Sequence, residues 1–143
     1  MGIFNTLFGK KKLKITDPDY GDIESIHIKG THVDWLVKQS FIGTHIDVFL
    51  RGDKNGISDI QKRTLQTILT QEAQISFESE KALKEQFENA NMEFINIDTH
   101  FDVRSLFIQE QGFELTFQEK KSPYYFFNVF FENNKAVGVS VDG

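Results

Sequence analysis

Residues 124–143, YYFFNVFFENNKAVGVSVDG, decide the fold. Two strand-like runs flank Asn133 and Asn134, and asparagine tolerates the positive φ angles that a two-residue type I′ turn requires at both positions. The run 135–142 alternates valine with small residues, so it has one apolar face. The run 124–131 is apolar on nearly both faces, which is typical of a strand covered on two sides. The pattern predicts a β-hairpin that ends the chain inside the core.

Alternation of apolar and polar residues predicts further strands on both sides of a helical block. Residues 23–30, 33–37 and 46–50 alternate in this way, and we expect them to form an antiparallel meander. In the run 101–107 the odd-numbered side chains are expected to share one face. The run 113–117 alternates more strictly, as in a strand with one buried and one solvated face.

The middle of the chain is predicted to be helical. Ser58 and Gln61 have the spacing of a capping box, in which each side chain satisfies a free backbone N–H of the other. The apolar periodicity then indicates two helices with a break at 75–79. The order βββ-αα-ββββ predicts an α+β fold, an antiparallel sheet with two helices packed on one face. We expect residues 17–143 to form this domain, preceded by an amphipathic, basic segment at 1–16.

Composition excludes several classes of function. The chain has no cysteine, so disulfides, thiolate metal sites and a cysteine nucleophile are ruled out. Its net charge is −5, although four of the 16 basic residues are lysines between positions 10 and 14. An acidic domain suits a basic protein partner better than a phosphate backbone. No apolar run approaches the roughly 20 residues of a membrane span. We therefore expect a cytoplasmic protein that binds no nucleic acid and no cofactor.

The N-terminal segment 1–14 allows two interpretations. Its apolar residues follow a helical spacing, and the lysines come directly after them. Gly2 and Thr6 also match the short pattern for N-myristoylation. A weak peripheral contact with an anionic membrane is one interpretation. The alternative, which the sequence favours, is a frayed tail that docks on the domain or stays disordered.

Asp98, His100 and Asp102 form the sharpest local pattern of polar residues. In an extended chain they project from one face, and carboxylate with imidazole suits a divalent cation. A small metal-dependent enzyme is therefore an alternative function. The competing interpretation, which the sequence favours, is the polar outer face of an ordinary strand. No catalytic residue is predicted.

Three histidines lie in the predicted meander, His27, His32 and His45. If His45 and His32 meet near Asp47 on the outer face, they form a cation site or a general-base pair. Polar cross-strand pairs on a solvated face explain the same residues.

The aromatic residues of 124–131 raise a further question. Phe126 and Phe130 share one face of this strand, whereas Phe127 and Phe131 lie on the other. If the helices cover only one sheet face, a partner, a curled sheet or the N-terminal segment must cover the remaining aromatics. An exposed aromatic patch would mark an interface, whereas burial within the domain is the interpretation that the sequence favours.

Several structural motifs resemble small bacterial domains of unknown function. They are Trp35, Phe41-x-Gly43, His45-Ile46-Asp47-Val48, Ile57-Ser58-Asp59-Ile60-Gln61 and Val137-Gly138-Val139-x-Val141-Asp142-Gly143. These families combine a β-meander, a helical middle and a C-terminal hairpin, and some members resemble immunity proteins that block a toxin. The resemblance implies a non-catalytic interaction domain and supplies no catalytic residue.

The acidic charge and the resemblance together favour an immunity-type protein that binds a basic partner. Its contact surface is expected to include exposed carboxylates of the sheet. The candidates are Asp47, Asp102, Glu114 and Glu119.

Overall fold

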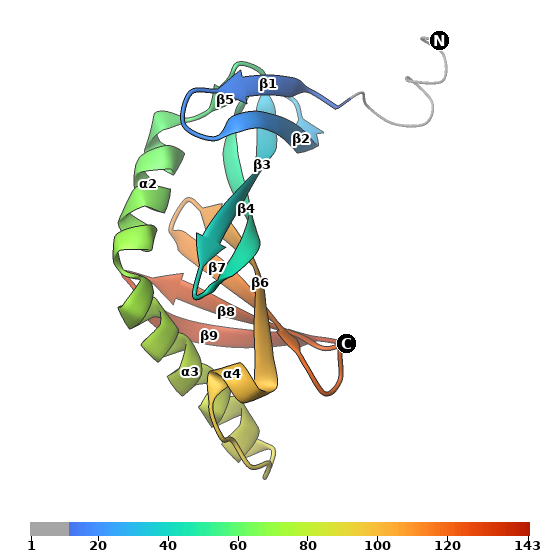
Figure 1. The fold of residues 1–143 in the computed structure, drawn as a ribbon, viewed down its shortest axis with the longest axis vertical. Helices are drawn as coiled ribbons and strands as arrows, with labels where there is room; N and C mark the ends of the chain where they lie inside the picture. Colours follow the sequence, from blue (N-terminus) through green and yellow to red (C-terminus); the bar gives the residue numbers. More distant parts are fainter. Residues whose placement is uncertain (1–11) are drawn as a thin grey trace.

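Nine strands form one twisted sheet with two long helices along one of its faces, in the computed structural model of residues 12–143 (Figure 1). The strands are β1 (Lys14–Asp17), β2 (Gly21–Lys29), β3 (His32–Phe41), β4 (Thr44–Asp53), β5 (Gly56–Ile57), β6 (Phe101–Gln109), β7 (Gly112–Glu119), β8 (Phe126–Glu132) and β9 (Lys135–Asp142). Their spatial order is β1-β2-β3-β4-β6-β7-β8-β9, and β5 pairs with β4. All pairs are antiparallel except β4–β6. The predicted α+β class is confirmed.

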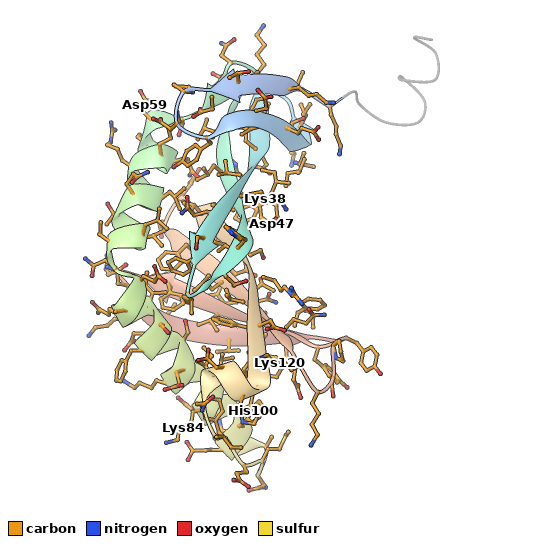
Figure 2. All side chains as sticks on the ribbon, in the orientation of Figure 1. Lys38, Asp47, Asp59, Lys84, His100 and Lys120 are labelled. Carbon is orange, nitrogen blue, oxygen red and sulfur yellow. The ribbon has the colours of Figure 1, made fainter. Side chains whose placement is uncertain are left out.

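The helices are α2 (Asp59–Thr70), α3 (Glu72–Asn89) and the short α4 (Ile97–His100); Figure 2 labels Asp59 and His100. The predicted pair of long helices is present, but the break lies at Gln71 and the prediction of 75–79 is wrong. The break was placed there because the apolar periodicity is interrupted and resumes only after residue 79. Ser79 is instead buried within α3, where its hydroxyl donates to the Ile75 carbonyl at 2.8 Å.

Ser58 caps the first helix as predicted. Its side-chain oxygen accepts from the Gln61 amide at 3.2 Å. The other half of the capping box differs, because Gln61 Oε1 accepts from the Arg51 amide at 3.2 Å. The Ser58 amide donates to the Arg51 carbonyl at 3.1 Å. Both contacts join the start of α2 to the end of β4.

Replacing Ser58 with alanine is expected to lower the free energy of unfolding by about 1 kcal/mol, because the Gln61 amide loses its acceptor. Urea denaturation followed by circular dichroism measures the change. Ser58→Asp is the control, since it keeps a capping oxygen and should stay within a few tenths of a kcal/mol of the wild type. Equal losses in both variants would show that the cap contributes nothing.

The core lies between the helices and the sheet face toward them. Leu65, Ile68, Ile75, Leu83 and Phe87 are the buried residues of α2 and α3 that join its apolar side chains. The Phe87 ring lies 5.6 Å from that of Phe101 and 6.3 Å from that of Phe127. Trp35 is fully buried, and its Nε1–H donates to the Asp53 carbonyl at 3.0 Å. The alternation of residues 33–37 is thereby confirmed, with Trp35 on the buried face.

The C-terminal hairpin forms as predicted, but it does not end inside the core. Asn133 and Asn134 have φ angles of 51° and 63°, as a type I′ turn requires. However, β9 is the edge of the sheet and contains no buried residue; Val137 and Val141 are 58% and 46% exposed. Alternation of valines indicates a strand but not its place in the sheet. It therefore did not reveal that β9 is an edge strand, with a neighbour on one side only. The first strand of the hairpin also starts later than expected, since Tyr124 lies outside β8 and is 76% exposed.

A β-bulge in β6 overturns the predicted face of residues 101–107. Phe101 and Val103 point into the core, but the register with β7 shifts between Val103 and Ser105. The extra residue reverses the alternation beyond it, so Leu106 becomes buried and Phe107 faces away from the helices. Alternation alone gave no sign of this reversal.

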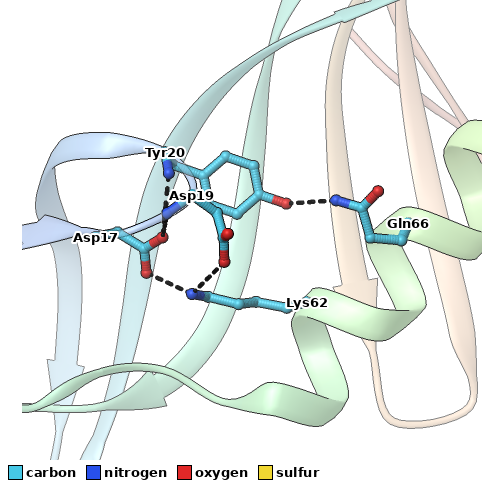
Figure 3. Close-up of polar contacts among 5 residues, drawn as sticks. All are labelled: Asp17, Asp19, Tyr20, Lys62 and Gln66. Carbon is cyan, nitrogen blue, oxygen red and sulfur yellow. Dashed lines mark hydrogen bonds and ion pairs between the residues drawn. The ribbon is translucent and has the colours of Figure 1, made fainter.

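A buried ion pair holds α2 against the β1–β2 turn (Figure 3). Lys62 Nζ lies 2.8 Å from Asp17 Oδ2 and 3.0 Å from Asp19 Oδ2. Asp17 is 5% exposed and also accepts from the amides of Asp19 and Tyr20. The Tyr20 hydroxyl accepts from Gln66 Nε2 at 3.3 Å. These contacts fix the first hairpin to the helical layer.

The sheet begins before residue 17, because β1 starts at Lys14, inside the segment 1–16 assigned to an extension. A weak membrane contact was one interpretation of the segment 1–14. Residues 1–11 of that segment lie outside the described residues. Lys12 and Lys14 are both ion-paired with Glu24, at 3.7 and 3.4 Å. Within residues 12–143, no helix has the length and apolar character needed to cross a membrane.

Candidate functional site

The sheet face away from the helices carries a row of large side chains across five strands. Each member of the row is the direct cross-strand neighbour of the next, from β3 to β8. In order, they are Leu36, Phe49, Phe107, Glu114 and Phe130. Their chain neighbours on both sides point into the core or toward the helices, because successive side chains of a strand alternate between faces. We call these five residues the open-face row. All five are half-buried.

The aromatic members of the open-face row form an apolar surface that no described helix covers (Figure 1). The rings of Phe49 and Phe107 are 6.0 Å apart at an interplanar angle of 52°. Phe126, at the start of β8, is also half-buried on this face. Partly exposed aromatic side chains on an uncovered sheet face are a feature of sites that bind another molecule. The sequence favoured burial of these aromatics within the domain, and the structure leaves them half-buried on a face without a helical cover.

A second row beside the first is polar and internally satisfied. Thr116 Oγ1 donates to Asn128 Oδ1 at 2.8 Å. Asn128 Nδ2 donates to Ser140 Oγ at 3.2 Å and to Asp142 Oδ2 at 2.8 Å. Asn128 is only 7% exposed. These hydrogen bonds join side chains of three adjacent strands. They thereby help to keep β7, β8 and β9 in register on the open face.

Two of the predicted interface carboxylates lie on the open face and are ion-paired. Asp47 pairs with Lys38 across the β3–β4 hairpin, and Figure 2 shows the two side by side. Asp102 lies 3.8 Å from Arg104 and 3.8 Å from Lys120. Both pairs are exposed, and exposed pairs contribute little to stability. They leave little net charge at these two positions.

Glu114 and Asp142, on the same face, differ from these pairs. Within residues 12–143 neither has a lysine or arginine at ion-pair distance. Glu114 accepts only a long hydrogen bond from Gln109 Nε2, at 3.4 Å. Burial raises the pKa of Glu114, and the negative charge of Asp142 raises it further. The open face therefore carries negative charge that no described lysine or arginine compensates.

Glu119, the fourth predicted carboxylate, lies on the opposite side of the sheet. Its cross-strand partner is Phe101, whose ring packs against α3. Glu119 lines an open hollow of about 620 Å³ together with Phe87 and His100. The sequence analysis assigned four carboxylates to one contact surface. The structure places Asp47, Asp102 and Glu114 on one face of the sheet and Glu119 on the other.

Sequence reasoning missed three members of the open-face row, Leu36, Phe49 and Phe107. A signal for two of them was present, because Leu36 and Phe49 stand at outward positions between buried neighbours where a solvated strand has polar residues. Phe107 had no such signal, since the bulge that turns it outward was not predictable from alternation.

The extended arrangement predicted for Asp98, His100 and Asp102 is wrong. Asp98 and His100 belong to α4, and only Asp102 lies in a strand. Asn96 caps this helix by accepting from the Thr99 amide at 2.7 Å. His100 Nε2 accepts from the Ile95 amide at 2.9 Å, so that nitrogen is already used. Across the described residues, no three His, Cys, Asp or Glu side chains are placed to hold a metal ion.

The three histidines of the first strands do not meet. His32 pairs with Lys29 at one end of the β3 ladder, and His45 pairs with Ser40 at the other. His27 Nδ1 lies 3.7 Å from Asp34 Oδ2, as a cross-strand polar pair. This arrangement agrees with the structural interpretation of these residues.

Comparison with protein-family models, with curated proteins and with solved structures found no match to this chain.

Proposed function

We propose that this chain is a protein-binding domain without catalysis of its own, and that a basic protein docks on its open face. The observation that carries the proposal is the open-face row of Leu36, Phe49, Phe107, Glu114 and Phe130. A folded domain gains by covering such apolar area, and the two long helices are already committed to the other face.

The composition of this face resembles the centre of a protein interface. Aromatic residues are enriched at such centres, and a few of them supply most of the binding free energy. Phe49, Phe107 and Phe130 would be those anchors, with the ion pairs of Asp47 and Asp102 at the rim. The net charge of −5 and the uncompensated Glu114 favour a basic partner and speed its encounter.

The resemblance to immunity proteins favours a toxin as the partner that is bound. A domain that docks by a broad, rigid face blocks whatever surface of the partner it covers. A toxin would be inhibited in this way without any chemistry on the side of the domain. The polar ladder at Asn128 supplies the rigidity that such occlusion needs.

The test compares two double variants of matched composition. Phe107→Ser with Phe130→Ser removes two anchors from the open face, whereas Ile60→Ser with Phe77→Ser removes apolar side chains of the helices that are 68% and 65% exposed. A partner co-purified with the wild type is itself purified, and its affinity for each variant is measured by calorimetry. We expect the open-face variant to bind at least tenfold more weakly, because each lost anchor contributes roughly 1–2 kcal/mol.

The helix variant should bind that partner like the wild type. Thermal melting of both variants controls for unfolding, and Phe49→Lys supplies a second, charge-based change on the open face. If the open-face variants, while folded, bind as tightly as the wild type, the proposal is wrong. Loss of binding in the helix variant alone would show that the interface lies on α2 and α3 and not on the open face.

A further inference from the structure

Glu114 lies in the open-face row between two phenylalanines. Its cross-strand partners are Phe107 on β6 and Phe130 on β8. Directly opposite residues of antiparallel strands place their Cβ atoms about 4.5–5.5 Å apart. The carboxylate is therefore flanked by an aromatic ring on each side, and Phe49 adds a third ring 6.0 Å beyond that of Phe107.

The carboxylate of Glu114 is incompletely satisfied by the described part of the chain. Asp34 and Asp47, on the same face, have Arg51 and Lys38 as partners. For Glu114 the structure offers only the neutral amide of Gln109 at 3.4 Å. A half-buried carboxylate between aromatic rings loses hydration without gaining a counter-ion, which is an unfavourable arrangement for the isolated domain.

A cation above this position would satisfy both features at once. It would neutralise the carboxylate and lie against the negative faces of the flanking rings. Arginine fits better than lysine, because its guanidinium is planar, less strongly hydrated and able to stack on a ring while binding a carboxylate. The sheet backbone holds the two phenylalanines on either side, so the geometry exists before binding.

We propose that the open face recognises one arginine side chain of its partner, which lies between Phe107 and Phe130 and pairs with Glu114. This inference rests on the proposed protein-binding function and specifies the group that is bound. Asp142, which also lies at no ion-pair distance from a described lysine or arginine, adds negative potential on the same face, four residues further along the strands. The arginine supplies the counter-ion that the carboxylate lacks.

The probe is a blocked pentapeptide, Val-Thr-Arg-Thr-Val, compared with the same peptide containing citrulline. Citrulline has nearly the shape of arginine but no charge. Titration into the labelled full chain, followed by NMR, reports affinity and location through the backbone amides of Glu114, Phe107 and Phe130. We expect the arginine peptide to shift these amides and to bind about tenfold more tightly than the citrulline peptide, as removal of a charge-assisted contact predicts.

Glu114→Gln and Glu119→Gln form the matched pair of variants, since both residues belong to β7 but lie on opposite faces. Glu114→Gln should remove the preference for arginine over citrulline, and Glu119→Gln should retain it. Binding of the arginine peptide to the wild type should weaken as the pH falls through the raised pKa of Glu114, because the protonated carboxyl cannot pair. Binding to Glu114→Gln should not depend on pH in this range.

Equal binding of the two peptides at the open face would overturn arginine recognition while leaving the protein-binding proposal intact. Shifts confined to other surfaces, or no binding of either peptide, would also overturn it. Neither result decides the wider proposal, which depends on the affinity of the purified partner for the Phe107→Ser, Phe130→Ser variant. A preference for arginine that survives in Glu114→Gln would assign the cation to another carboxylate and contradict the inference.

Discussion

Replacing Trp35 with alanine is expected to lower the free energy of unfolding by about 4 kcal/mol, the largest effect of any single substitution considered for this chain. Trp35 is fully buried in β3 and belongs to the main hydrophobic core. Alanine would leave a cavity that rigid strands on both sides cannot close. It would also remove the hydrogen bond from Nε1 to the Asp53 carbonyl at 3.0 Å.

Urea denaturation measures this loss, followed by far-ultraviolet circular dichroism because Trp35 is the only tryptophan and its fluorescence disappears with it. Trp35→Phe is the graded control. It keeps most of the buried ring and should lose about 1–2 kcal/mol. It also keeps the prediction testable if the alanine variant does not fold. Similar stability of the alanine variant and the wild type would mean that the sheet does not pack around this residue.

Replacing Asp17 with alanine is expected to lower the free energy of unfolding by about 3 kcal/mol at neutral pH, because the charge-assisted hydrogen bond between Lys62 and the buried carboxylate is lost, and Lys62 keeps only the exposed Asp19 as a partner. The Asp17 side chain is 4% exposed and that of Lys62 is 18% exposed, so solvent screens the pair weakly. The substitution also leaves the amides of Asp19 and Tyr20 without their acceptor. Figure 3 shows that these contacts come from both the first hairpin and α2.

The effect of Asp17→Ala should depend on pH in a definite direction. Burial by itself raises the pKa of Asp17, but hydrogen bonds from Lys62 and from two backbone amides outweigh it, so the pKa lies below its usual 3.8. The stabilisation is therefore present above about pH 4 and is lost as the pH falls through the lowered pKa. The hydrogen bond to Asp17 raises the pKa of Lys62, so its contribution is lost only as the pH rises past 10.5.

Chemical denaturation of the wild type and Asp17→Ala between pH 2 and 7 tests this dependence, and the difference between them should shrink toward the acid end. Asp19→Asn is the control, because its side chain is 62% exposed and exposed pairs contribute less than about 1 kcal/mol. A loss in Asp19→Asn equal to that in Asp17→Ala would show that burial of the pair contributes nothing.

Part of the candidate site was predictable from sequence, and part was not. The carboxylates Asp47, Asp102 and Glu114 were expected on an outer sheet face and do share one. Phe130 was expected to need a cover if the helices occupy only the other face. The fourth carboxylate, Glu119, lies on the other face because it is in phase with the buried Phe113, Leu115 and Phe117, a consequence of strand alternation that the grouping overlooked. No pattern in the sequence indicated that Glu114 would stand between two aromatic rings.

Local chemistry explains what the sequence by itself determined. Asparagines 133 and 134 impose a hairpin because they accept positive φ, Ser58 starts a helix because its oxygen accepts a free amide, and alternation places Trp35 in the core. These are interactions between residues near one another in the chain. They determine the element types and the α+β class.

Tertiary structure alone decided which elements became neighbours and which faces stayed open. The parallel pairing of β4 with β6 brings Phe49 to Phe107 across a separation of 58 residues in sequence, and the bulge in β6 turns Phe107 outward to meet it. Burial of α2 and α3 on one side leaves the other side uncovered. Because register, bulges and helix docking are set by packing of the whole sheet, the open face around Glu114 exists only in the folded chain.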